Sequence, residues 1–339
     1  MSERSKRTSV TAHANCPAAG QLHEVVAGVH AWVQPDGSWW LNNAGAVAGV
    51  GDDGTHPAGT VVIDTCATFQ RTRQFLDAVD TVTGDAPVTM AANTHQHGDH
   101  TYGNCVLPRQ TVIIGQEAMR AGLLADPIID GCPPVWSPVP DWGPVTRRVP
   151  AITVRDTMTV FNGTRRIELH HPGYAAHTTG DLVAWLPEER VLFTGDLIFH
   201  GLTPLVFMGS VGGARRSLEW IGSFAPDHLV PGHGPLVDRT SLAGTLDDHD
   251  RYYQLVERTA AEGRRDGLGP LEAARRCDLG PFAEWADSER LVLNLHRAYA
   301  DAAGTELDLL AAMVDAMQFN GGPMTTHVCC APSVSPTAG

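Results

Sequence analysis

Residues 94–100 read Thr94-His95-Gln96-His97-Gly98-Asp99-His100, directly after a predicted strand over 87–92. The stretch places three imidazoles and one carboxylate within six residues. A helix would spread these side chains around its circumference, whereas a loop leaving a strand lets them converge on one point. Neutral imidazole and carboxylate oxygen are ligands that zinc and related divalent ions take. The stretch therefore predicts a metal-binding loop.

Three later positions offer further ligands, each at a predicted strand end or tight turn. His177 opens His-Thr-Thr-Gly-Asp, Asp196 ends Phe-Thr-Gly-Asp, and His233 is central in Pro-Gly-His-Gly-Pro. The glycines let the backbone approach a site closely. His170 and His171 compete with His177 for the ligand role, and the Thr-Thr-Gly-Asp that follows favours His177.

Short strands and helices alternate on both sides of these motifs. Strands are predicted over 25–33, 39–50, 60–64, 87–92, 111–114, 165–170, 181–186, 190–193 and 229–230, and helices over 69–82 and 214–224. Beyond about residue 240 the strand pattern stops, and helices follow over 242–260, 285–299 and 305–317, the last opened by a capping pattern at Thr305. The chain thus divides into a flexible tail (1–20), a catalytic α/β domain (21–240), a helical region (241–319) and a flexible tail (320–339).

The composition limits the class of function. The 339 residues are 43% hydrophobic and 18% charged, which is typical of a globular protein. The net charge of −14 argues against a nucleic-acid partner. Lys6 is the only lysine, so a lysine Schiff base and a lysine-dependent phosphate loop are excluded. The seven cysteines include no Cys-x-x-Cys pair, which excludes a zinc knuckle and gives no sign of a disulfide framework.

The N-terminal residues and the hydropathy predict a location. The charged segment 1–7 is followed by no apolar run, so it is not a signal peptide. No stretch reaches the roughly 18 apolar residues of a membrane span. We therefore expect a soluble, cytoplasmic protein that acts on a small molecule, with no membrane partner.

The motifs resemble, in their order, those of the metallo-β-lactamase superfamily, and more narrowly its glyoxalase II-like and SoxH-like metallo-hydrolases. The resemblance covers about residues 24–238 and includes Asp64, which ends Val-Val-Ile-Asp. It implies an αββα sandwich with a dinuclear zinc site, here followed by a helical extension. Carried over, it assigns His95, His97 and His177 to the first zinc, Asp99, His100 and His233 to the second, and Asp196 to both. Asp64 is implied to brace the ligand loop.

This ligand set implies a hydrolase with two Zn²⁺ per chain. A water between the ions would have a pKa near 7 and attack an acyl carbon, while Asp99 would orient it and return a proton to the leaving group. His200 and Tyr174 lie near ligands in the sequence and are further catalytic candidates. A hydrophobic pocket is expected from five aromatic residues: Trp39, Trp40, Trp136, Trp142 and Phe199. The predicted substrate is a hydrophobic or aromatic ester, thioester or lactone from secondary metabolism.

Two alternatives on the same fold stay open. One is a non-hydrolytic zinc lyase or cyclase of secondary metabolism, and the other is a mononuclear iron dioxygenase. The complete set of Asp99, His100 and His233 argues against the mononuclear site. The helices after residue 240 shape either the pocket or a homodimer interface, and the sequence does not choose between them.

Overall fold

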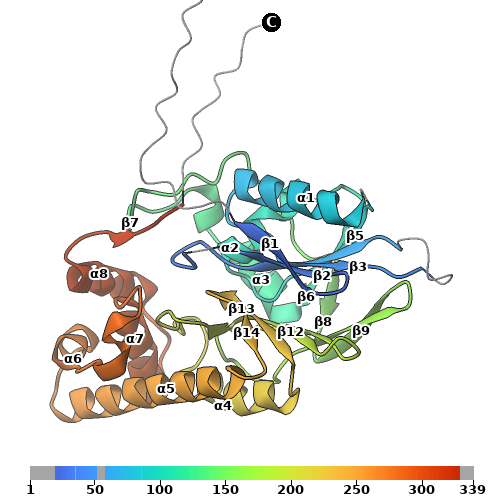
Figure 1. The fold of residues 1–339 in the computed structure, drawn as a ribbon. Helices are drawn as coiled ribbons and strands as arrows, with labels where there is room; N and C mark the ends of the chain where they lie inside the picture. Colours follow the sequence, from blue (N-terminus) through green and yellow to red (C-terminus); the bar gives the residue numbers. More distant parts are fainter. Residues whose placement is uncertain (1–19, 35, 52–57, 85, 329–339) are drawn as a thin grey trace, which may run out of the picture.

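The computed structural model describes residues 20–34, 36–51, 58–84 and 86–328. Two β-sheets face each other in the middle of the molecule, and helices cover their outer faces (Figure 1). A further group of helices, α6 to α8, lies at one side of this sandwich. The predicted fold class, an αββα sandwich with a C-terminal helical part, is confirmed.

The first sheet has seven strands in the order β1-β2-β3-β4-β5-β6-β8. Their bounds are Gln21–Val26 (β1), Val29–Val33 (β2), Ala44–Ala48 (β3), Thr60–Ile63 (β4), Val88–Ala92 (β5), Val112–Gln116 (β6) and Ile152–Val154 (β8). The strands β4, β5, β6 and β8 run parallel. Their carboxyl ends therefore meet at one edge of the sheet, where the segments after β4 and β5 both begin.

The second sheet has six strands in the order β14-β13-β12-β11-β10-β9. Their bounds are Thr157–Asn162 (β9), Arg165–His170 (β10), Val183–Leu186 (β11), Val191–Phe199 (β12), His228–His233 (β13) and Val237–Asp238 (β14). Only β12 and β13 pair in parallel. Phe199, at the end of β12, is in register with His233, at the end of β13.

The inner faces of the two sheets form a core of β-branched and aliphatic side chains, among them Val47 and Ile63 from the first sheet and Ile167 and Val230 from the second. Helix α1 (Phe69–Thr83) covers the outer face of the first sheet through buried residues such as Phe75. The remaining helices on this side are short: α2 (Gly98–Thr101) and α3 (Glu117–Ala125).

Helices α4 (Val211–Ser223) and α5 (Leu242–Arg265) cover the outer face of the second sheet. Helices α6 (Pro270–Arg276), α7 (Arg290–Ala303) and α8 (Leu309–Asn320) pack around them in the C-terminal helical region (Figure 1). Buried side chains of α5 and α7, including Tyr252 and Leu291, join the same core as the ends of the second sheet.

Several predicted boundaries are wrong. The strand expected from residue 39 begins at Ala44, because residues 39–43 form a buried turn before β3. Helix α8 begins at Leu309 rather than at residue 305, since the side chain of Asp308, not that of Thr305, caps its first turn. The helix expected from residue 285 begins at Arg290.

The C-terminal tail expected over 320–339 is ordered in its first part. Met324–Thr325 (β15) pairs with Trp136–Ser137 (β7), and the side chain of Met324 is fully buried. The packing of Met324 against the core explains why this segment is fixed. The N-terminal tail predicted over 1–20 lies outside the described residues except for Gly20, as do residues 329–339 of the C-terminal tail.

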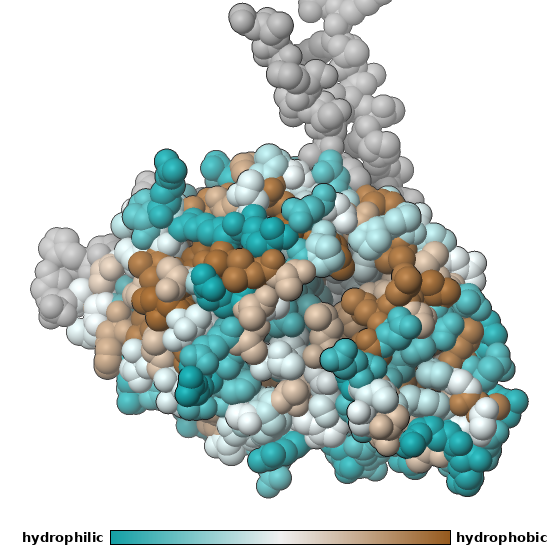
Figure 2. Space-filling model, turned by 180° about the vertical axis from the view of Figure 1, so that it is seen from behind, coloured by the Kyte–Doolittle hydropathy of each residue, from teal (hydrophilic) through white to brown (hydrophobic). Residues whose placement is uncertain are grey.

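Hydrophilic and hydrophobic residues are interspersed on the face of the molecule shown in Figure 2. The exposed apolar side chains include Phe161 on β9 and Leu310 on α8. Within the described part of the chain, no helix combines the length and the apolar character needed to cross a membrane.

Candidate metal centre

The metal-binding loop predicted over residues 94–100 leaves the carboxyl end of β5 and enters helix α2. His97 precedes that helix in an extended conformation, with φ −62° and ψ 149°. Gly98 follows, and a β-carbon there would collide with the ring of Tyr102. The change from extended to helical backbone turns the side chains before and after Gly98 toward the same edge of the sandwich.

Seven side chains from this loop and from three later segments form two adjacent groups. The first ligand group is His95, His97, His177 and Asp196, and the second ligand group is Asp99, His100 and His233. Within each group, one possible ligand atom of every residue lies within 4.8 Å of the others. The sequence-based prediction named these seven residues, divided the other six in the same way and assigned Asp196 to both groups, and the structure brings all seven together.

Asp196 lies between the two groups. Its Oδ2 atom is 3.4 Å from His177 Nε2 in the first group and 3.4 Å from His233 Nε2 in the second. Its Oδ1 atom is 3.0 Å from His100 Nε2. Gly232 has no room for a side chain because a β-carbon there would overlap Asp196. The carboxylate is thus placed where one residue can serve both groups.

In four of the five histidines, the nitrogen that faces away from Asp196 is fixed by a neighbour. These pairs are His95 Nδ1 with Thr94 Oγ1 (3.0 Å), His100 Nδ1 with Asp64 Oδ2 (2.8 Å), His177 Nδ1 with the Leu205 carbonyl (2.6 Å) and His233 Nδ1 with the Gly37 carbonyl (2.7 Å). A carbonyl or carboxylate partner holds the proton on Nδ1 and leaves the Nε2 lone pair free to bind a metal.

Asp64, which the resemblance implies to brace the loop, is in contact with it. It accepts hydrogen bonds from the Thr94 N–H and hydroxyl, both at 2.7 Å, in addition to its contact with His100. Its backbone has φ +61°, which is uncommon for a residue other than glycine. Such strain is found where the surrounding structure needs one particular side-chain position.

His97 is the least enclosed member of the two groups. Its Nδ1 atom lies 2.9 Å from His177 Nε2, and its Nε2 atom lies 3.2 Å from the Met208 sulfur. The ring stacks on Phe207 at 5.6 Å between centroids. The open side of the centre is therefore lined by apolar side chains.

The donor set fits a cation. Three buried atoms at its middle have no hydrogen-bond partner, His95 Nε2, His100 Nε2 and Asp196 Oδ1, and the last two approach each other without hydrogen-bond geometry. Buried polar atoms without partners are rare in proteins unless an ion or water satisfies them. Imidazole and carboxylate donors without a thiolate are suited to zinc and to related first-row divalent metals.

The two groups differ in charge. Burial lowers the pKa of His177 to about 3, and the pKa of His95 well below its usual value. Burial would also lower the pKa of His233, but Asp196 and Asp99 outweigh it and raise that pKa to about 9. The pKa of Asp196 is held well below its usual range by the surrounding histidines, against the opposing effect of burial.

The other predicted catalytic residues lie outside the two groups. His200 contacts the Pro235 carbonyl through Nδ1 at 2.9 Å. Tyr174 lies beneath Arg216, whose guanidinium carbon is 4.2 Å from the ring centre. Their catalytic roles stay predictions.

The predicted pocket residues are buried. Trp40 packs on Trp136 and Trp142 with ring centroids 5.0 and 4.7 Å away, and Trp39 packs on Trp136 at 5.4 Å. Phe199 stacks on His233 of the second ligand group at 5.1 Å. The structure gives all five residues a packing role, and their contact with a substrate remains a prediction.

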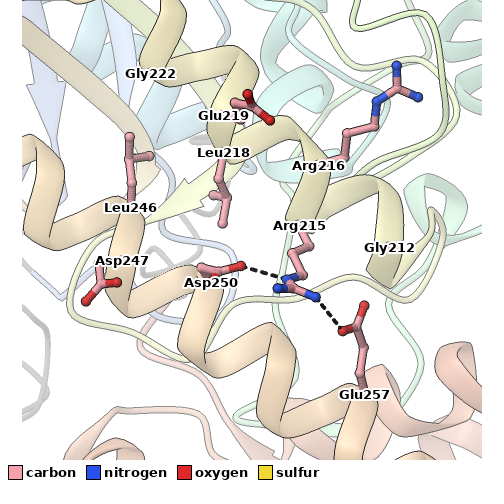
Figure 3. A pocket seen from close by; sticks show the side chains of 10 residues that line it. All are labelled: Gly212, Arg215, Arg216, Leu218, Glu219, Gly222, Leu246, Asp247, Asp250 and Glu257. Atoms are coloured by element: carbon pink, nitrogen blue, oxygen red, sulfur yellow. Dashed lines mark hydrogen bonds and ion pairs between the residues drawn. The ribbon is translucent and has the colours of Figure 1, made fainter.

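A surface groove between α4 and α5 lies apart from both ligand groups (Figure 3). Arg215 points across it and pairs with Asp250 at 2.6 Å and Glu257 at 3.0 Å. These three side chains are more than a third exposed. The groove thus contains a surface ion-pair network and none of the candidate ligands.

Sequence reasoning missed the residues that support the ligands. Asn43 donates hydrogen bonds to the carbonyls of Pro231 (3.0 Å) and Gly234 (2.8 Å), on both sides of His233. Gly37 supplies the carbonyl behind His233. No motif marks either residue, since both act through backbone groups that become neighbours only in the folded chain.

An αββα sandwich with two histidine–aspartate groups at one edge is the arrangement of a metallo-hydrolase fold. The chain belongs to the metallo-beta-lactamase superfamily, whose family model matches residues 43–233.

The chain is also similar to two proteins of known name. It is 29% identical over 223 residues to the hydroxyacylglutathione hydrolase of Halorhodospira halophila, which covers 63% of this chain and 73% of that protein. It is 27% identical over 186 residues to the 2,4-dinitroanisole O-demethylase subunit alpha of Nocardioides sp., which covers 52% of this chain. The second match spans about half of that subunit, 49% of its length.

Solved structures share the fold. A metallo-beta-lactamase from Pontibacter korlensis aligns with a TM-score of 0.54 and 18% identity over 67% of this chain and 97% of its own. A stereoselective inverting sec-alkylsulfatase from Pseudomonas sp. aligns with a TM-score of 0.64 and 18% identity over 86% of this chain and 51% of its own. At these identities the likeness shows the fold alone.

Proposed function

We propose that the protein is a hydrolase that uses two zinc ions to cleave an ester, thioester or lactone of a small hydrophobic or aromatic molecule. The observation that carries this proposal is the position of Asp196, whose Oδ2 atom lies 3.4 Å from one histidine of each ligand group and whose Oδ1 atom lies 3.0 Å from His100 of the second group. A single metal would need no such shared carboxylate. The similarity to a hydroxyacylglutathione hydrolase supports acyl transfer to water as the reaction.

The first ligand group would hold one zinc ion and the second ligand group the other, with Asp196 shared. When bound, zinc supplies Lewis acidity and lowers the pKa of coordinated water to about 7. The buried contacts behind the histidine rings keep the ligand nitrogens in position, so that little reorganisation is needed when the metals bind.

Asp99 is the proposed proton carrier. Its Oδ2 atom lies 3.2 Å from His233 Nε2 and 3.7 Å from His100 Nε2. Burial would raise its pKa, but the two histidines hold the pKa below the usual value, so the carboxylate is ionised at neutral pH. In that form it can accept a proton from the attacking water and later return it to the leaving group.

The surroundings of His97 support an apolar substrate. Phe207 stacks on its ring, and the Met208 side chain beside it is 39% exposed. Such a surface favours contact with an aromatic or aliphatic acyl group. We propose Tyr174 and His200 as outer contacts of a larger substrate. The similarity to a 2,4-dinitroanisole O-demethylase subunit makes an aromatic ether a second candidate substrate.

The test combines metal analysis with a substrate panel. Purified protein should contain two zinc ions per chain and hydrolyse some of a panel of aryl esters, thioesters, lactones and one aryl methyl ether. Chelation should abolish the activity, and added zinc should restore it. One iron per chain would favour an oxygenase instead. A product without the mass of an added water would favour a lyase or cyclase.

A further inference from the structure

Arg290, the first residue of α7, is a buried charge for which the proposed reaction has no use. The residue is 1% exposed. Its guanidinium donates to the Thr203 carbonyl at 3.0 Å and pairs with Asp287 at 2.8 Å. Burying a guanidinium is costly unless its contacts compensate. Its place in the helical region therefore calls for a reason other than packing.

One contact of Arg290 leads to the second ligand group through an aromatic ring. The guanidinium carbon lies 5.4 Å from the centre of the Phe199 ring, within range of a cation–π interaction. Phe199 in turn stacks on His233, with an angle of 8° between the ring planes. Arg290 thus fixes the side chain against which the His233 imidazole rests.

A second connection runs through residues 37–39. The guanidinium carbon lies 4.6 Å from the Trp39 ring centre, and Trp39 Nε1 donates to Glu289 at 2.6 Å. The Ser38 hydroxyl donates to Asp287 at 2.7 Å. This segment carries the Gly37 carbonyl that faces His233 Nδ1.

Gly37 leaves the segment little freedom to move independently of His233. Its backbone has φ +68°, and a β-carbon there would lie 2.7 Å from the nitrogen of Gly234. Any displacement of residues 37–39 would therefore shift the acceptor of His233 Nδ1 and the turn that carries the histidine.

We propose that Arg290, together with Asp287 and Glu289, is a positioning residue for His233, so that the C-terminal helical region completes the second ligand group. The inference rests on the metal-binding roles in the proposed function. It assigns to the helical region a part in metal affinity, in addition to its packing on the sandwich.

The test measures the two stepwise zinc affinities of metal-free protein by competition with a chromophoric chelator. R290M keeps an unbranched apolar side chain in place of the aliphatic part of Arg290 and removes the guanidinium. We expect the affinity of the second ligand group to fall about 10- to 100-fold, as found for groups that orient metal ligands. The zinc affinity of the first ligand group in R290M should stay within about threefold of the wild-type value.

Reference variants identify the group that is affected. H233A and H177A each remove one ligand, from the second and the first group respectively. The absorption spectrum of cobalt-loaded R290M should shift toward that of H233A and away from that of H177A. W39F keeps an aromatic ring beside Arg290 but removes the hydrogen bond to Glu289 and part of the indole that packs on Trp136. It should show the same change to a smaller extent, and it tests the proposal independently if R290M folds poorly.

R165M is the control for a general loss of stability. Arg165 is 10% exposed at its side chain and donates to the carbonyls of Gly28 (3.1 Å) and Ala48 (2.6 Å), and it contacts neither ligand group. R165M should lower the melting temperature without changing either zinc affinity.

Unchanged zinc affinities in R290M and W39F would overturn the inference, and so would an equal loss in R165M. Wild-type protein that bound a single zinc would contradict the proposed dinuclear function itself. That result can be told apart from a failure of the Arg290 inference, because it is seen in the wild-type protein before any variant is compared.

Discussion

The two ligand groups share Asp196 but are built differently. The first group has three imidazoles besides Asp196, and burial lowers the pKa of each of them. The second has two imidazoles with raised pKa values beside Asp99. His97 gives the first group an open side, whereas all members of the second are buried.

The cause of the difference is the placement of carboxylates. Asp64, Asp99 and Asp196 surround His100 and favour its protonated form, against the effect of burial. His177 has one carboxylate neighbour, Asp196 at 3.4 Å, and otherwise faces a backbone carbonyl and another histidine. The first group therefore offers neutral donors ready for a cation, whereas the second must release protons before it binds one.

Replacing the shared carboxylate should have the largest effect and would break the comparison. D196N keeps the size of the side chain but removes the negative charge that faces both groups. We expect kcat/KM to fall by about 10³-fold or more and both zinc affinities to weaken, measured by steady-state kinetics and metal analysis.

D227N is the matched control for D196N. Asp227 pairs with Arg190 (3.0 Å) and Arg239 (3.1 Å) at the surface, and exposed pairs of this kind contribute little to stability. The kcat/KM of D227N should stay within about twofold of the wild-type value. Loss of only one metal in D196N would show that Asp196 serves one group rather than both.

The pH dependence of zinc binding should separate the groups next. The pKa of His233 is raised to about 9, so below that pH zinc must displace its proton. For each proton that zinc displaces, the zinc affinity of the second group should fall about tenfold for every pH unit below 9. The pKa of His177 is lowered to about 3, so His177 itself adds no such dependence between pH 6 and 8. If the zinc affinities of both ligand groups depended on pH with the same slope, the proposed difference between the groups would be wrong.

A smaller effect is expected from the brace behind the loop. Asparagine in D64N tolerates the positive φ and still accepts from the Thr94 N–H, but it no longer offers His100 a carboxylate. The zinc affinity of the second group should fall about 10- to 100-fold, and that of the first group less. Isothermal calorimetry on metal-free protein measures both, and an equal loss would show that Asp64 acts only through Thr94 and the neighbouring His95.

The features that were predicted from the sequence are those that depend on residues close together in the chain. The spacing within residues 94–100 marked the ligand loop, and the glycines beside His233 marked a close backbone approach that Gly232 makes to Asp196. The order of the motifs then indicated the family and its fold. These features are readable because each depends on residues adjacent in the chain.

Contacts between distant segments were not predictable in the same way. The Trp39–Glu289 bond joins residues 250 positions apart, and nothing in either local pattern pairs them. The contact between Trp39 and Trp136 was not readable either, and the segment around residue 136 also pairs with β15 near the end of the described chain. Boundaries such as the start of α8 depend on which of two capping side chains is in place.

The smallest expected effect concerns the open side of the first group. M208L removes the sulfur that lies 3.2 Å from His97 Nε2 while keeping an apolar side chain of similar volume. Zinc affinity should change by less than about threefold, because His97 faces His177 with its other nitrogen. KM for a hydrophobic ester should change more than kcat, since Met208 is partly exposed beside the centre. If kcat fell while KM stayed constant, Met208 would be supporting His97 rather than facing the substrate, and the first group would be as dependent on its surroundings as the second.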